Sequence, residues 1–192
     1  EIGVDPIAYT YDWGLVTDLA RRNISRICGR LGIEHILVCA DIAKKREHVR
    51  KNVKAWLKKP SLGMVPLFMA GDKEYFSEAQ KVAKDMQLST IVFGDNLLET
   101  TNFKKGFAGV APSGWQDGRA NKLRSIEKLC LMRFYFDHFA RNRGYWNSSL
   151  LETFNAFGVY YHKKLEYTNL YNYIPWDEKE IESVLIGKYD WE

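Results

Sequence analysis

The chain has 192 residues, of which 46% are hydrophobic and 27% are charged, and its formal net charge is +4. This length suffices for one domain of ordinary size with a real core, and the composition excludes disordered and fibrous proteins. The sequence contains no apolar run of membrane-spanning length and does not begin like a signal peptide, so we expect a cytoplasmic protein without membrane insertion. Its first and last residues suggest a segment of a longer protein.

Cysteine and histidine are few and scattered. The three cysteines, Cys28, Cys39 and Cys130, lie far apart among apolar neighbours, and no CxxC pair occurs. This pattern is typical of buried, reduced thiols in a cytoplasmic protein. The four histidines are equally dispersed, so the sequence gives a zinc site almost no support, and we assign no residue as a ligand of a resident metal.

Strands and helices are predicted to alternate in the first half of the chain. Short apolar runs predict strands, and apolar residues spaced three and four apart predict helices. "HILVCA" is apolar throughout, which is typical of a strand covered on both faces. The predicted order is a strand over 6–11, a helix over 15–31 that Gly32 ends, a strand over 35–40, a helix over 41–60, a helix over 72–86 and a strand over 89–94. This alternation requires crossover connections, so we expect an α/β domain with a doubly wound parallel sheet.

The helix predicted over 41–60 is strongly basic, with eight Lys or Arg against two acids. Val49, Val53, Trp56 and Leu57 recur at helical spacing, so we expect them on the inner face and the cations on the outer face. The basic face is either simply solvated or a surface for polyphosphate, nucleic acid or an acidic partner.

The second half of the chain is predicted to be mostly helical, with a long helix over 123–142. Ser149 and Glu152 have capping-box spacing for a further helix, and Asp177 and Glu180 repeat that spacing near the C-terminus.

This change of character divides the chain into an α/β domain over 1–111 and a helical extension over 112–192 packed on it. The aromatic content of the extension exceeds what one small core needs, so a homodimer contact is plausible.

Two predicted strand ends carry polar residues, "YTYDWG" and "FGDN". In open parallel sheets, ligands bind beyond the carboxyl ends of the strands. Backbone groups there can contact an adenine, a glycine lets a ligand approach closely, and a following helix N-terminus can hold phosphate. In the simpler interpretation, Asp12 caps the next helix and the residues of the second stretch only form a turn. The candidate binding residues are Tyr9, Thr10, Tyr11 and Asp12 at the first end and Gly94, Asp95, Asn96 and Glu99 at the second.

The stretch "DPIAYTYDWGLVTDLARRNISRICGRLGIEHILV" resembles the segment that follows the phosphate-binding loop in PP-loop ATPases, also called ATP pyrophosphatases. "VFGDNLLET" is similar to a later strand end of that family, and "YIPWDEKEI" resembles its Pro-containing segment before a late helix. The similarity is greatest to N-acetyl sugar amidotransferases of surface-polysaccharide (LPS) biosynthesis. The resemblance implies a Rossmann-like fold of the adenine nucleotide alpha-hydrolase type. The family's SGGxDS loop does not occur in this chain, and its expected place is upstream of Glu1.

The resemblance also implies an ATP-dependent ligase that uses ATP and Mg²⁺. A sugar oxygen would attack the α-phosphate, releasing pyrophosphate, and ammonia would then displace AMP. It places Tyr9, Thr10, Tyr11 and Asp12 near the adenine and ribose, and Gly94 and Asn96 near the nucleotide. Asp95, Asn96 and Glu99 are the candidate catalytic residues, with Asp95 and Glu99 contacting magnesium or substrate.

No cysteine nucleophile typical of a glutaminase is evident, so ammonia would come from a separate glutaminase subunit. Two alternatives remain open. The first is a PP-loop enzyme that modifies tRNA, for which the basic helix is the main support, although no cysteine is suitably placed for thiolation. The second is a non-catalytic nucleotide-binding module.

Overall fold

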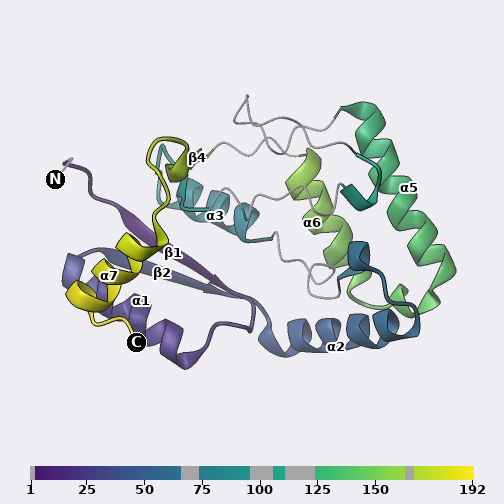
Figure 1. Cartoon of the computed structure of the whole chain (residues 1–192), viewed down its shortest axis with the longest axis horizontal. Coiled ribbons are helices and arrows are strands. Elements are labelled where there is room, and N and C mark those ends of the chain that lie inside the picture. Colours follow the sequence, from purple (N-terminus) through teal and green to yellow (C-terminus); the bar gives the residue numbers. More distant parts are fainter. Residues whose placement is uncertain (1–2, 66–73, 96–105, 111–123, 163–166) are drawn as a thin grey trace. The chain divides into compact units, whose positions relative to one another are not determined.

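The computed structural model describes residues 3–65, 74–95, 106–110, 124–162 and 167–192 (Figure 1). The chain is mixed α/β and mostly helical. It forms two compact units, one of Glu1–Ala43 with Pro175–Glu192 and the other of Lys44–Ile174. The predicted boundary between residues 111 and 112 lies outside the described residues and stays a prediction. Within the described ranges, no helix is both long and apolar enough to cross a bilayer.

The first unit contains a parallel strand pair joined by a helix. The strands pair in parallel from Ile7↔Glu34 to Asp12↔Cys39, as expected for a crossover connection. Thr17 accepts a hydrogen bond from the Ala20 amide at the start of the helix, and Gly32 ends it in the left-handed conformation with φ 66°. The elements of this unit are β1 (Ile7–Asp12), α1 (Asp18–Leu31), β2 (Glu34–Cys39) and α7 (Glu178–Tyr189).

Two arginines of α1, Arg26 and Arg30, bind the C-terminal segment while their side chains remain partly exposed. Arg30 donates to the Lys188 carbonyl over 2.6 Å and pairs with the Asp190 carboxylate. Arg26 pairs with the Glu192 carboxylate over 3.0 Å, and the buried Asn23 side chain donates to the Glu192 carbonyl over 2.9 Å. These contacts attach the C-terminal segment to α1, which lies near the other end of the sequence.

The second unit is mainly helical. Its residues supply a second, very short parallel pair, Val92↔Thr168 and Phe93↔Asn169. The elements are α2 (Ile42–Lys58), η1 (Leu62–Met64), α3 (Glu74–Asp85), β3 (Val92–Phe93), α5 (Ser125–Arg141), η4 (Arg143–Tyr145), α6 (Leu150–His162), β4 (Thr168–Asn169) and η5 (Leu170–Asn172). Ala43 is the last residue of the first unit, so α2 begins there and continues into the second.

The described residues form less sheet than predicted, and a doubly wound sheet is not shown among them. Among the described residues there are two separate two-stranded parallel sheets, β1–β2 and β3–β4. Leu37 of β2 is 41% exposed and Cys39 is exposed, so the prediction that this strand is covered on both faces is wrong, as is the burial predicted for Cys39. An apolar run identifies a strand but does not show whether a further layer covers it.

The core of the second unit lies between α2, α5 and the segment that joins α5 to α6. Asn142 ends α5, and its side chain donates to the Ala55 carbonyl of α2 over 2.6 Å. Gly144 follows, where an added Cβ would lie 3.0 Å from the Ala55 Cβ, so α2 and this turn pack at backbone distance. The buried apolar core residues are Ala55, Met64, Val110, Leu131, Tyr135, Phe139 and Tyr145.

Helix α2 has about the predicted extent, but its buried face matches the prediction only in part: Trp56 packs against the core and Val49 is half-buried, as predicted. Val53 is 38% exposed and Leu57 is 64% exposed, whereas Lys45, His48 and Asn52 are almost fully buried. The helix buries a polar stripe because partners from distant parts of the chain lie opposite it. The helical periodicity of the α2 sequence does not reveal these partners.

Candidate functional site

The turn after β1 is held by a buried carboxylate. Asp12 is fully buried, and its Oδ1 accepts a hydrogen bond from the Gly14 amide over 2.8 Å. Its Oδ2 forms an ion pair with Arg21 of α1. Gly14 has φ 99°, a conformation that side chains rarely adopt, and an added Cβ would lie 3.0 Å from the Ile42 side chain. The carboxylate therefore fixes the turn and the following helix, and Thr17 is the residue that caps that helix.

The other candidate residues at this end lie along β1 itself. Tyr9, Thr10 and Tyr11 are half-buried. The Thr10 hydroxyl lies 3.0 Å from His35 Nε2 of the neighbouring strand, and the Asp12 carbonyl accepts from the Ala40 amide over 2.8 Å. The ladder thus continues one residue past β2, which holds this strand end rigid.

The second predicted site follows β3. Gly94 is exposed, and the Asp95 carbonyl accepts a hydrogen bond from the Asn169 side chain over 2.9 Å. Asn96 and Glu99 lie outside the described residues. The residues after β1 and those after β3 belong to different units, so the predicted convergence of the two strand ends stays a prediction.

Packed rings fix the segment before this turn. Phe93 of β3 makes edge contacts with Phe76 at 5.0 Å and with Tyr167 at 5.1 Å between ring centroids. Tyr75 stacks on Phe76 at 4.1 Å. The contacts attach β3 to α3 and to the residue before β4, which sets the starting point of the Gly94–Asp95 turn.

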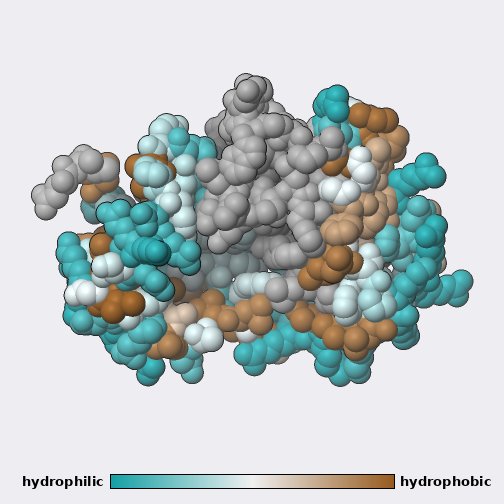
Figure 2. All heavy atoms as spheres, viewed as in Figure 1, coloured by the Kyte–Doolittle hydropathy of each residue, from teal (hydrophilic) through white to brown (hydrophobic). Residues whose placement is uncertain are grey.

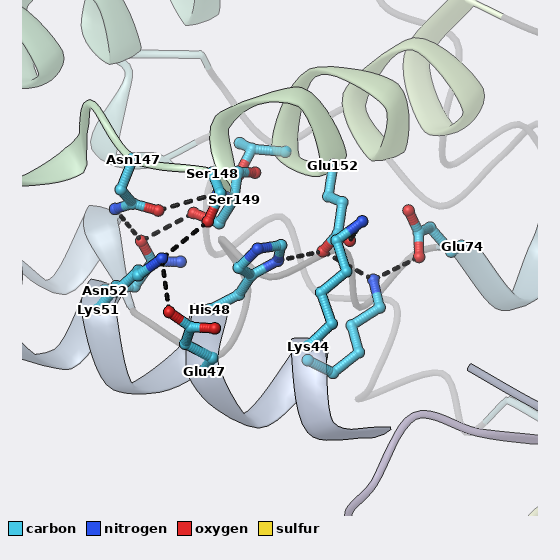
Figure 3. Close-up of polar contacts among 12 residues, drawn as sticks. Lys44, Glu47, His48, Lys51, Asn52, Glu74, Asn147, Ser148, Ser149 and Glu152 are labelled. Carbon is cyan, nitrogen blue, oxygen red and sulfur yellow. Dashed lines mark hydrogen bonds and ion pairs between the residues drawn. The ribbon is translucent and has the colours of Figure 1, made fainter. Parts of the chain in front are cut away.

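Four residues of the second unit, Lys45, His48, Glu74 and Glu152, form a cluster that is named here the buried charged cluster, since Lys45 and His48 are almost fully buried. Figure 3 shows His48 and Glu74 on either side of Glu152. The Lys45 ammonium lies 2.6 Å from Glu74 Oε2 and 3.0 Å from Glu152 Oε2. His48 Nδ1 is 2.8 Å from the same Glu152 oxygen. One ammonium thus joins the first turns of α2, α3 and α6, and each carboxylate stands in the first turn of its helix, where negative charge is favourable.

An uncharged network continues the cluster along α2. Asn52 Oδ1 accepts from Ser149 Oγ over 3.0 Å and from Asn147 Nδ2 over 3.2 Å. Ser149 and Glu152 therefore bind α2, and α6 begins at Leu150, directly after Ser149, as the spacing of this pair predicts. Asn52 Nδ2 is buried and has no hydrogen-bond partner among the described residues.

Hydrogen bonding sets the charge state of Glu152. Burial raises its pKa, but hydrogen bonds from His48 and Lys45 and the positive charge of Lys45 outweigh burial and leave the pKa below the usual value of 4.5. The carboxylate is therefore ionised at neutral pH. Its position suits it to hold the Lys45 ammonium and the His48 ring in fixed orientations.

We expect this ionised carboxylate to make folding stability depend on pH. The pKa of Glu152 is lower in the folded chain than in the unfolded one, so its contribution is present above 4.5 and is lost as pH falls through the folded pKa. Urea unfolding of the wild type and of Glu152→Gln measures it. The wild type should be more stable at neutral pH, and the difference should shrink below pH 4.5; a difference independent of pH would contradict the assignment.

Sequence reasoning missed the charged cluster for a specific reason. Lys45 is one of eight basic residues in a helix predicted to have a basic outer face, and nothing local distinguishes it from its neighbour Lys44. The one available signal was the spacing of Lys45, His48 and Asn52. These residues are three and four positions apart and therefore lie on one face of the helix.

The described residues and the comparisons with known proteins identify neither a ligand nor a relative of this chain. Among the residues that the structure describes, no group of three or more His, Cys, Asp or Glu is arranged to hold a metal ion. Comparison with protein-family models, with curated proteins and with solved structures found no match to this chain.

Proposed function

We propose that this chain is part of an ATP-dependent amidotransferase or ligase of the PP-loop type, acting on a sugar in surface-polysaccharide biosynthesis. The observation that carries the proposal is the β1–α1–β2 unit. Its two strands are parallel and in register, and β1 ends in a buried aspartate that a glycine with φ 99° follows. A parallel strand end with a glycine turn and a following helix is the arrangement that nucleotide sites use. The reaction, the substrate class and the cofactors of the proposal come from the resemblance of this segment to the PP-loop family.

The proposed reaction has two steps. A substrate oxygen attacks the α-phosphorus of ATP, the bond to the bridging oxygen breaks, and pyrophosphate leaves. The nitrogen of ammonia then attacks the activated carbon, and AMP leaves with the original substrate oxygen. Little covalent chemistry falls to the protein, so positioning and charge neutralisation supply most of the acceleration.

In this proposal, β1 binds the adenosine part of ATP. The Thr10–Asp12 strand end offers backbone groups and the half-buried tyrosines beside them, while the Asp12 carboxylate acts by holding the turn, because Gly14 and Arg21 already occupy its two oxygens. Gly94 and Asn96 contact the nucleotide, and Asp95 and Glu99 are the candidate ligands for Mg²⁺, which would neutralise phosphate charge.

The proposal also covers the sheet, the source of ammonia and the cellular compartment. We propose that β1 and β2 belong to one doubly wound parallel sheet of the adenine nucleotide alpha-hydrolase type. Ammonia would come from a separate glutaminase subunit. The protein would act in the cytoplasm, where ATP and nucleotide-linked sugars are present.

One observation favours a second function. Arg50, Lys54 and Lys58 of α2 are exposed and recur every four residues, so they form a cationic row along one side of the helix. Such a row suits the regularly spaced phosphates of nucleic acid. A PP-loop enzyme that modifies tRNA is therefore the alternative.

Pyrophosphate release separates these functions. The full-length protein is incubated with ATP, Mg²⁺ and ammonium chloride, and release is measured alone, with N-acetylated amino sugars and with tRNA. Release that requires an amino sugar is expected. Release that requires tRNA would replace the proposal with the alternative, and absence of release with ATP still bound would leave a non-catalytic binding module.

A further inference from the structure

Helix α5 presents a row of large apolar side chains to solvent. Its buried face uses Leu131, Tyr135 and Phe139, so the helix already has a complete contact with the core. On the opposite side, four residues spaced three or four apart, here named the α5 stripe, are each more than half exposed: Ile126, Leu129, Met132 and Phe136. Contiguous exposed apolar surface of this kind is uncommon on a monomer and is typical of interaction sites.

The exposed surface continues onto neighbouring elements. Phe154 of α6 lies beside α5, since its ring centroid is 6.1 Å from that of Phe139, and it is also more than half exposed. Trp146, between the two helices, is 65% exposed although its indole nitrogen is bonded to the Phe139 carbonyl. Figure 2 shows hydrophobic residues gathered over α5, next to hydrophilic ones.

Cations accompany the stripe. Arg133 follows Leu129 by four residues and precedes Phe136 by three, so it lies on the same face, and it is exposed. From Arg124 to Arg143 the chain has five Lys or Arg, and Glu127 and Asp137 are the two carboxylates there. Glu127 is bound to Arg124 over 2.8 Å. Phe, Met and Arg are the residues enriched at the centres of protein interfaces.

We propose that the α5 stripe binds a different protein, through an apolar helix of that protein flanked by carboxylates. A second copy of this chain fits less well. A two-fold interface places the same patch on both sides, so it would bring the Arg133 side chains of both copies into one interface without a carboxylate of the stripe to pair with them. Like charges brought together in this way oppose association, whereas carboxylates on a partner would pair with them. This inference does not depend on the proposed reaction.

Peptide binding to the full-length protein tests this proposal. The probe is a fluorescently labelled amphipathic helix with a Leu/Phe face flanked by glutamates, compared with the same peptide carrying lysines in their place. Anisotropy should show the acidic peptide binding at least about tenfold more tightly. Phe136→Ala should weaken its binding, and Arg133→Glu should abolish the preference. Lys54→Glu, an equal change of charge on the exposed side of α2, should leave it intact.

Three outcomes would overturn the proposal. They are equal binding of the two peptides, binding unaffected by Phe136→Ala, and a concentration-dependent dimer in sedimentation that Leu129→Glu disperses. The last would identify a second copy of this chain as the occupant. Far-ultraviolet circular dichroism of each variant checks that the helix content is unchanged.

Discussion

Replacing Lys45 with methionine is expected to lower the free energy of unfolding by about 3 kcal/mol, because it leaves two largely buried carboxylates without their shared cation. Lys45 lies 2.6 Å from Glu74 and 3.0 Å from Glu152, and its side chain is only 5% exposed. Methionine keeps the length of the aliphatic stem, so the loss reports charge more than packing. Urea unfolding followed by circular dichroism measures the difference.

The adjacent residue is a matched control for this prediction. Lys44 carries the same charge and lies 3.4 Å from Glu152, but its side chain is 55% exposed. Exposed ion pairs contribute about 1 kcal/mol or less, so Lys44→Met should have a small effect. Equal effects of the two substitutions would mean that the buried charged cluster does not form as described.

The second large effect is expected at Asp12. In Asp12→Asn, the amide oxygen can still accept from Gly14, but the amide nitrogen then faces the Arg21 guanidinium, donor against donor. A partly buried hydrogen bond between two charged groups is lost, and we expect a loss of about 2 kcal/mol in unfolding free energy. Asp18→Asn, an exposed carboxylate in the first turn of α1, should cost only a few tenths of a kcal/mol through the helix dipole.

ATP binding adds a separate measurement on the same two variants of the full-length protein. Asp12 holds the strand end that the proposed nucleotide site uses, so Asp12→Asn should weaken ATP binding while Asp18→Asn leaves it unchanged. If Asp12→Asn loses stability by the expected amount but binds ATP as tightly as the wild type, the structural role of Asp12 is supported. The proposal that β1 forms part of the nucleotide site is then contradicted.

The local parts of the fold were predictable because their signals are local. An apolar run, a capping hydroxyl and a glycine in the left-handed conformation define β1, α1 and its end at Gly32, and the N-cap at Asp177 has the predicted spacing, with its side chain accepting from the Glu180 amide. In these cases the residues that determine the structure lie within a few positions of one another.

The rest depended on contacts between distant residues. Lys45 meets Glu74 and Glu152, which lie 29 and 107 residues further along the chain. The two-residue strand β4 was not predicted, because Thr168 and Asn169 form a strand only by pairing with β3. Of the proposed nucleotide contacts, those on β1 belong to a local strand end, and those after β3 lie partly outside the described residues.

The proposed chemistry is tested most directly by following the substrate oxygen. If that oxygen attacks the α-phosphorus of ATP, an amino sugar labelled with heavy oxygen at its reacting position will transfer one labelled atom to AMP in the presence of the full-length protein, Mg²⁺ and ammonium. Mass spectrometry of the AMP should show the label in every AMP formed with turnover. Unlabelled AMP, or formation of ADP instead, would contradict adenylation of the substrate by this protein.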